Sequence, residues 1–186
     1  MISGHNTAAV PNMISISQFR KNVKDDFIQI FCDEDVFCPV CLGNLNKHGW
    51  CHRDLKEEDG VVHYYLPVLY CKRCNRSHRA LPNFMIPYKR YYADAFAEIY
   101  DHPNEPYSLN NGVDETHFRH MRAWVCAFVA FAKRFLTGLK IQHPELTADY
   151  DTGSTLSALK YFVRIVVNSN EWRFSVPPLP PPGFVL

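Results

Sequence analysis

Long apolar segments are absent from this sequence of 186 residues. No apolar run reaches the roughly 18 residues that a helix needs to cross a bilayer, and the longest candidate, Ala123–Ala132, is followed at once by Lys133 and Arg134. The opening residues 1–13 also lack the basic region and apolar run of a secretion signal. We therefore expect a soluble, cytoplasmic protein without membrane contacts.

A strong overall charge is absent as well, because the net charge is only +1. This argues against a chain that binds nucleic acid over its whole surface. The distribution is uneven: residues 71–140 carry a net +5, residues 1–70 carry −3 and residues 141–186 carry −1. A localised basic surface is what phosphate binding needs, although an ordinary solvated surface can show the same bias.

Cysteine, in contrast, is present in a recognisable pattern. The pairs Cys38/Cys41 and Cys71/Cys74 each have C-x2-C spacing, and 29 residues separate them. Thiolates at positions i and i+3 bind one ion from a tight turn, and two such turns complete a tetrahedral shell for which zinc is the usual occupant. Because the protein fills all four positions, we expect one structural zinc ion rather than a catalytic one.

Other interpretations of these cysteines stay open. A rubredoxin-like iron centre uses the same four ligands, and buried thiols or two disulfides also fit the spacing, although disulfides are less compatible with a chain that lacks a secretion signal. The remaining cysteines, Cys32, Cys51 and Cys126, show no pairing pattern. Cys32 can serve as a spare ligand, but a core or surface thiol is the more common role.

The segment between the two cysteine pairs has the pattern of a β-hairpin. The strands His48–Arg53 and Val61–Tyr70 flank a polar stretch that ends in Asp59-Gly60, a strong turn signal. Pro67 cannot donate to a ladder, which indicates an edge strand or a bulge. A hairpin between two cysteine knuckles is the layout of a zinc ribbon, and so small a sheet depends on the metal for much of its folding energy.

Apolar residues at steps of three and four predict helices in the rest of the chain. The predicted helices are Ser15–Phe31, Tyr91–Asp101, a long helix that starts after an Asp114 N-cap and ends near Lys140, and Thr155–Asn168, capped by Ser154 or Asp151. The long helix carries an apolar stripe along Phe118–Leu139.

These patterns together predict an α+β chain, in which a small four-cysteine zinc ribbon, built as a β-hairpin, precedes an all-helical domain with one long helix. The expected parts are an N-terminal helical segment (residues 1–37), the ribbon (38–90), the helical domain with a divergent helix-turn-helix (91–175) and a proline-rich tail (176–186). The run Val176–Gly183 favours polyproline II.

Several short motifs resemble known families. They are Cys38-Pro39-Val40-Cys41, His48-Gly49, Arg53, Leu69–Cys74, Ser77–Pro82 and Pro87–Tyr91. This stretch resembles an uncharacterised bacterial family of short zinc-ribbon proteins, often encoded in or near mobile elements. It is also similar to the amino-terminal zinc-binding segment of certain insertion-sequence transposases, in which a ribbon precedes a helix-turn-helix that binds transposon ends. The resemblance implies a recognition helix that opens with Thr116, His117, Arg119, His120 and Arg122.

Signatures of DNA-processing enzymes are missing. No room remains for a transposase sheet with three spaced carboxylates, and none of the histidines has the arginine three residues on that a tyrosine recombinase needs. The nearest match to a paired-histidine nickase, His117 and His120, has the wrong spacing. Cys126 and His120 can be drawn as a nucleophile and base, but a cysteine in an apolar helix is more often a packing residue. We therefore expect no catalysis.

Three histidines lie near the predicted ribbon, namely His52, His63 and His78. Each can replace a metal ligand or contact phosphate, but a surface or hydrogen-bonded core histidine is the more common case.

The leading hypothesis is a non-catalytic zinc protein that binds DNA as an accessory or regulator of a mobile element. Phosphate contacts are expected from Lys72, Arg73, Arg76, Arg79, Lys89 and Arg90, and base contacts from Arg119 and Arg122. A solvated face is the alternative role of these residues. The alternative hypothesis is a zinc-ribbon adaptor or self-associating scaffold. Apolar residues occupy more than half of the circumference of the helix along Phe118–Leu139, so we expect a protein partner or a second copy to cover them.

Overall fold

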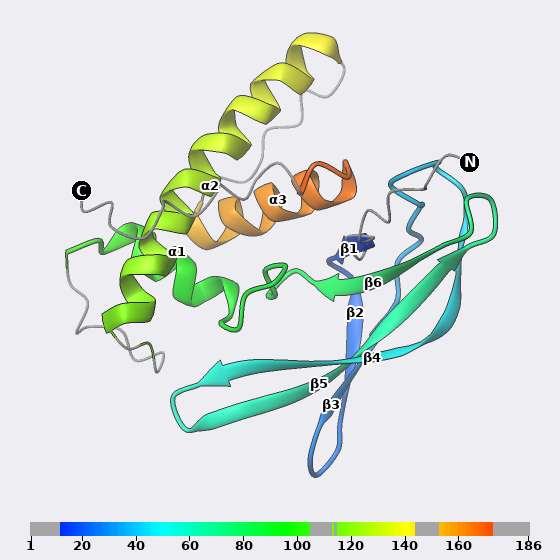
Figure 1. The fold of residues 1–186 in the computed structure, drawn as a ribbon, viewed down its shortest axis with the longest axis horizontal. Coiled ribbons are helices and arrows are strands. Elements are labelled where there is room, and N and C mark those ends of the chain that lie inside the picture. Colours follow the sequence, from blue (N-terminus) through cyan, green and yellow to red (C-terminus); the bar gives the residue numbers. More distant parts are fainter. Residues whose placement is uncertain (1–11, 105–112, 114, 144–152, 173–186) are drawn as a thin grey trace, which may run out of the picture.

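The strands of this protein form one curled, mixed sheet, and the helices gather on one side of it (Figure 1). The computed structural model describes residues 12–104, 113, 115–143 and 153–172. Its elements are β1 (Asn12–Ile16), β2 (Phe19–Val23), β3 (Ile28–Cys32), β4 (Leu45–Glu57), β5 (Gly60–Cys71), β6 (Arg76–Pro82), α1 (Ala93–Asp101), α2 (Glu115–Gln142) and α3 (Thr155–Asn168). The predicted Asp114 cap, the Asp151 cap and the proline-rich tail lie outside the described residues.

The sheet is organised around β5. One edge of β5 pairs with β4 along its whole length, and its other edge pairs first with β3, at Tyr64 and Tyr65, and then with β6, at Val68–Cys71. Pro67 lies between these two sets of partners, where neither the β3 ladder nor the β6 ladder includes it. The change of partner along one strand curls the sheet. Of the two alternatives that Pro67 suggested, the edge strand was wrong, because β5 is central; an irregularity of the ladder does occur nearby, between Lys47 and Gly49 of β4.

The predicted helix at Ser15–Phe31 was wrong, because this region forms β1, β2 and β3. Its apolar residues do recur at steps of three and four, but the chain turns twice within this region, so they do not lie on one face of a helix. The turn between β2 and β3 is closed by a 2.8 Å hydrogen bond from Lys24 N–H to the Phe27 carbonyl. β1 pairs in parallel with β6, far along the chain. Partners so remote in sequence override the local helical pattern.

The predicted fold class was also wrong. The cysteine-bearing hairpin is not a small independent ribbon followed by an all-helical domain, because β4, β5 and β6 belong to a sheet of six strands. Fully buried residues of that sheet, such as Ile16 and Leu66, belong to the same hydrophobic cluster as Phe96 of α1 and Phe128 of α2. Sheet and helices therefore share one core, which buries far more apolar surface than a ribbon can.

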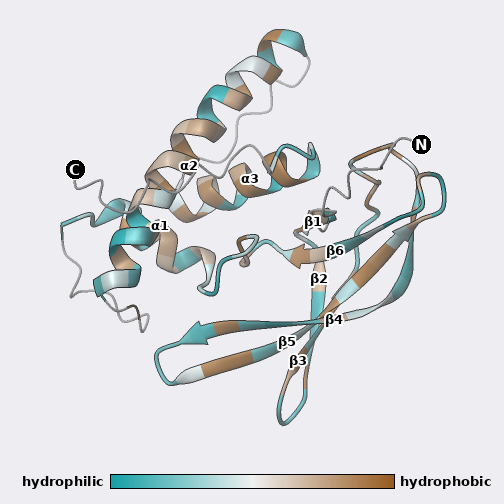
Figure 2. Ribbon diagram, in the orientation of Figure 1, coloured by the Kyte–Doolittle hydropathy of each residue, from teal (hydrophilic) through white to brown (hydrophobic). Residues whose placement is uncertain are grey.

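The three helices lie close to their predicted positions, and α3 has the predicted Ser154 cap, whose hydroxyl accepts from Ser157 N–H at 3.1 Å. The apolar stripe of α2 is largely buried against α1 and α3; its buried members include Phe118, Met121, Val125, Phe128 and Ala132. Figure 2 shows hydrophobic residues along α3 and the neighbouring half of α2. In the described part of the chain, no helix combines the length and apolarity that crossing a membrane requires.

Polar contacts fix α3 to the sheet. The Asn168 side chain donates to the Ser15 carbonyl (3.1 Å) and accepts from Ser15 N–H (2.8 Å), so it satisfies backbone groups of β1 as a neighbouring strand would. Arg164 binds both carboxylate oxygens of Glu34, at 2.7 and 3.1 Å. Burial opposes ionisation of Glu34, but the hydrogen bonds from Arg164 and from two backbone N–H groups outweigh it and hold the Glu34 pKa below its ordinary value.

Candidate functional site

The first cysteine pair lies in a tight turn after β3. Cys38 N–H donates to the Gly43 carbonyl at 2.9 Å, and Leu42 N–H donates to the Cys38 carbonyl at 2.8 Å. Leu42 has a φ of +58°, in the left-handed region that leucine rarely adopts. The turn therefore carries backbone strain that its surroundings must offset.

The second cysteine pair repeats this geometry. Cys71 is the last residue of β5, and Cys74 lies in the turn that leads into β6. Asn75, directly after the second cysteine of this pair, has a φ of +57°, as Leu42 has after Cys41. Asparagine tolerates this conformation well. Each C-x2-C segment is thus followed by one left-handed residue, which turns the chain back so that both sulfurs face the same point.

The four sulfurs converge. The Sγ atoms of Cys38, Cys41, Cys71 and Cys74 all lie within 4.8 Å of one another, and the distances Cys38–Cys74 and Cys41–Cys71 are both 3.5 Å. A tetrahedral ion with metal–sulfur bonds of about 2.3 Å places its sulfurs about 3.8 Å apart, whereas a disulfide requires about 2.05 Å. The four cysteines are free thiols that can bind a metal ion, as their spacing predicted.

The thiols differ in how readily they ionise. Burial opposes ionisation of Cys71, but the backbone N–H groups of Cys74 and Arg73 and the Cys41 thiol outweigh it and lower the pKa of Cys71 to about 7. Burial and then the neighbouring thiols raise the pKa of Cys74 to about 12. An ion at this site would bind thiolates, so its binding would release the protons that the thiols carry.

Three neighbours shape this site. His78, fully buried on β6, places Nε2 3.3 Å from the Cys38 sulfur, and burial lowers its pKa. Arg73 donates to the Cys41 carbonyl at 3.0 Å. Gly43 lies so close that an added Cβ would approach the Cys71 sulfur to 3.2 Å. The sequence drew attention to His78 and Arg73 but not to Gly43, whose only signal is its position two residues after Cys41.

The structure distributes the eight predicted nucleic-acid contacts over three regions. Lys72, Arg73 and Arg76 lie at the cysteine end of the sheet, and Arg79 follows on β6. Lys89 and Arg90 lie in the connection between β6 and α1, and Arg119 and Arg122 lie in the first turns of α2. All are exposed except Lys89, which is half-buried.

Several of these cations have partners within the chain. Besides Arg73, Lys89 places its ammonium 4.4 Å from the ring centre of Trp124, and burial lowers its pKa. Arg119 pairs with Glu115 at 2.5 Å. Arg53, which belonged to the resembling motifs, donates from one guanidinium nitrogen to the Ile86 carbonyl at 2.9 Å and so ties β4 to the segment before α1. These contacts give the residues structural roles that the sequence did not indicate.

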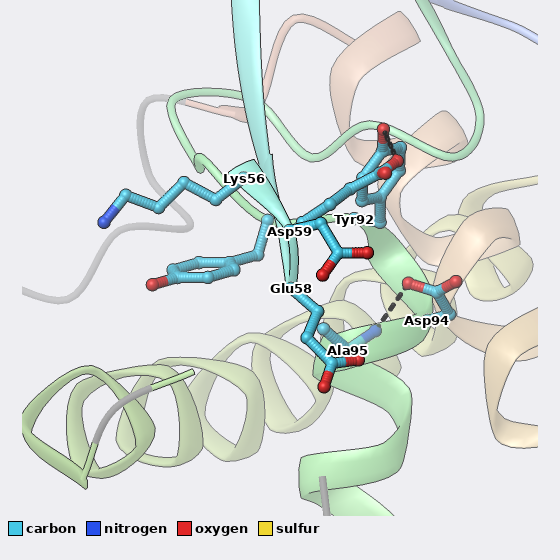
Figure 3. A pocket seen from close by; sticks show the side chains of 8 residues that line it. Lys56, Glu58, Asp59, Tyr92, Asp94 and Ala95 are labelled. Carbon is cyan, nitrogen blue, oxygen red and sulfur yellow. Dashed lines mark hydrogen bonds between the residues drawn. The ribbon is translucent and has the colours of Figure 1, made fainter. Parts of the chain in front are cut away.

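Apart from the cysteine site, a cavity lies at the tip of the β4–β5 hairpin beside the start of α1 (Figure 3). This cavity of about 350 Å³ is lined by Lys56, Glu57, Glu58, Asp59, Tyr91, Tyr92, Asp94 and Ala95. The Tyr92 hydroxyl donates to Glu57 at 2.6 Å, and burial and then this hydrogen bond raise the pKa of Tyr92. Four of its lining residues are acidic, which disfavours phosphate binding in this cavity.

Comparison with protein families identifies one domain. Residues 38–120 match a family described as a domain of unknown function (DUF6431), which spans both cysteine pairs, α1 and the start of α2. The predicted resemblance to an uncharacterised family is therefore confirmed only as a match to a domain of unknown function. Nothing in that match refers to zinc ribbons or transposases. No curated protein and no solved structure matches the chain.

Proposed function

We propose that this protein binds nucleic acid without catalysis, through a surface shaped by one zinc ion at Cys38, Cys41, Cys71 and Cys74. The observation that carries the proposal is the convergence of the four sulfurs within 4.8 Å at the turn between β5 and β6. Four thiolates are the usual ligand set of structural zinc sites, and full coordination by protein would make the role of the ion structural.

The metal would hold a basic turn in place. Lys72 lies between two ligands, and Arg76 begins the strand that follows, so ligation would fix the backbone on both sides of Lys72 and just before Arg76, both of which are exposed. Cations held in fixed positions bind phosphates with a smaller entropic cost than mobile ones. The proposal does not depend on Arg73, Lys89 or Arg119, because each of these already has a partner within the chain.

The test is the salt dependence of binding to a fluorescent DNA duplex, measured by anisotropy. We expect an affinity that falls steeply with salt, because each phosphate contact contributes about 0.9 to the slope of log K against log salt. Replacing Lys72 and Arg76 with glutamine should lower that slope by about 2. A matched control replaces Lys133 and Arg134, which are exposed on α2, and should leave the slope nearly unchanged.

No binding at low salt, or equal losses in the two double variants, would reject the proposal.

The further proposal that the protein serves a mobile element depends only on the resemblance of residues 38–92 to the families described above. A transposase or recombinase gene beside the gene for this chain would support that proposal.

A second candidate function is self-association through the end of α2. Phe131 and Phe135 stack with ring centres 6.1 Å apart and are only partly buried, and Ile141 is 75% exposed. The two phenylalanines belong to the Phe118–Leu139 stripe, and Ile141 follows it, so this end of α2 keeps some apolar surface uncovered. Light scattering of the purified chain tests this candidate: a dimer that Phe135→Ser converts to a monomer would support it, and a monomer at all concentrations would reject it.

A further inference from the structure

Three potential metal ligands meet on the outer face of the β4–β5 hairpin. Side chains alternate along a strand, so His52 and Asp54 of β4 share one face. Asp54 is paired directly with His63 of β5, which brings the third side chain onto the same face. All three residues are exposed.

The three side chains point at one another. A single oxygen of Asp54, Oδ1, lies 2.9 Å from His52 Nε2 and 2.7 Å from His63 Nδ1. The two imidazole rings lie 5.5 Å apart with an interplanar angle of 28°. One ligand atom from each residue lies within 4.8 Å of the other two, so the group can surround a single ion.

We propose that His52, Asp54 and His63 form a second metal site, for a divalent transition ion such as Zn²⁺, Co²⁺ or Ni²⁺. Two imidazole nitrogens and one carboxylate oxygen suit these ions, whereas Mg²⁺ and Ca²⁺ prefer sets made of oxygen alone. Bonds of about 2.0–2.1 Å to a tetrahedral ion place the ligand atoms about 3.4 Å apart. The carboxylate oxygen therefore has to move away from each ring by only about half an ångström.

This site differs from the cysteine site in kind. Three protein ligands leave a coordination position for water or another ligand, as in metal sites that exchange or react. His52 and Asp54 also line a cavity of about 400 Å³ whose other walls include Lys56, Lys89 and Arg90. Its basic lining favours an anionic oxygen, such as that of a phosphate, as the additional ligand.

The two sites are also well separated. His63 and Cys71 lie on the same strand, eight residues apart, which corresponds to about 26 Å at 3.3 Å per residue. A spectroscopic probe can therefore report on each site independently, because only one of them contains sulfur.

The experiment titrates Co²⁺ into the purified protein after a single equivalent of zinc has filled its cysteine site. We expect one further equivalent to bind with the weak visible d–d bands of nitrogen and oxygen ligands and without the intense near-ultraviolet band of thiolate-to-cobalt charge transfer. His52→Gln and His63→Gln should each weaken this binding by at least the roughly 10–100-fold that loss of even an outer-shell partner costs. His48→Gln, an exposed histidine of β4 outside the group, is the matched control and should bind like the parent.

Absence of a second equivalent, or undiminished binding by the double variant of His52 and His63, would overturn the proposal. All the substituted side chains are exposed, and circular dichroism of each variant would verify its fold. A failure of the zinc proposal at the cysteines would be visible separately, because Co²⁺ would then give no thiolate band in protein freed of metal.

Discussion

Loss of the metal is expected to unfold the two cysteine turns while the rest of the sheet stays folded. The perturbation is Cys74→Ser. Cys74 is only partly buried, whereas Cys38 and Cys71 are fully buried. A serine at position 74 therefore stays hydrated, and its effect comes from the lost ligand rather than from a buried hydroxyl group.

The magnitude follows from how little else holds these turns. Ordering the thirteen residues of segments 36–44 and 72–75 costs about 1–2 kcal/mol each, or about 13–26 kcal/mol in all. Apolar burial offsets little of this cost, because Phe37, Val40 and Leu42 are 59%, 38% and 76% exposed. A structural zinc ion supplies about 10–16 kcal/mol, which is the right size to order the turns and leaves them unfolded when it is absent.

The remaining strands have a different source of stability. Leu55 and Leu66 are fully buried in the core that the sheet shares with the helices, so β4, β5 and β6 should persist without metal. Their stability still falls by linkage, by about 4 kcal/mol where free zinc is 1,000 times its dissociation constant. For a chain of this length, that corresponds to a drop in Tm of about 10 °C.

The assay combines metal analysis, thermal unfolding and amide hydrogen exchange. We expect no bound zinc in Cys74→Ser, and loss of protection at the Cys38 and Leu42 amides, which are hydrogen-bonded in the folded turn. Cys126→Ser, an exposed cysteine of α2, is the control and should behave as the parent. Full zinc occupancy in Cys74→Ser, or turn amides that stay protected after chelation, would refute the reasoning.

Three further predictions concern packing around the sheet. Glu34→Gln should destabilise the protein by about 2 kcal/mol at pH 7, because it breaks a charged pair with Arg164. Since the Glu34 pKa is lowered on folding, this contribution is present above its ordinary value near 4.3 and is lost as the pH falls through the folded-state pKa. Denaturant titrations of parent and variant should therefore converge as the solution is acidified, and a constant difference would contradict this. Gly43→Ala should weaken zinc binding in a competition assay with a chelator, because its Cβ presses on the Cys71 sulfur, and equal affinity would contradict this. Asn168→Ala should cost about 1–3 kcal/mol by leaving backbone groups of β1 without partners, and a Tm within 1 °C of the parent would contradict it.

Local patterns predicted what local interactions determine. Ligands three residues apart bind one ion from a single turn, so the spacing of Cys38/Cys41 and Cys71/Cys74 was sufficient to find the candidate metal site. The hairpin between them followed from the Asp59-Gly60 turn signal and the two strand-like segments on either side of it. The helices followed from their apolar period and, for α3, from a cap that acts within one turn.

Features that depend on distant partners could not be predicted in this way. Residues 12–32 form strands because they pair with β5 and β6, and their own sequence does not indicate those partners. The roles of Arg73 and Lys89 are similar, because a long basic side chain can reach a phosphate, a carbonyl or an aromatic ring, and tertiary packing decides which of these it contacts. The meeting of His52, Asp54 and His63 required the register of β4 against β5.

Because β1 pairs with β6, the segment that matches the family is shorter than the segment that forms the complete sheet. The family match begins at residue 38, yet β1 and β3, which cover one edge of β6 and part of one edge of β5, come from residues 12–32. A fragment cut to residues 38–120 would leave those backbone N–H and C=O groups without partners, and exposed strand edges of this kind recruit other chains. Insoluble aggregates from such a fragment would therefore say nothing against the activity of the whole chain.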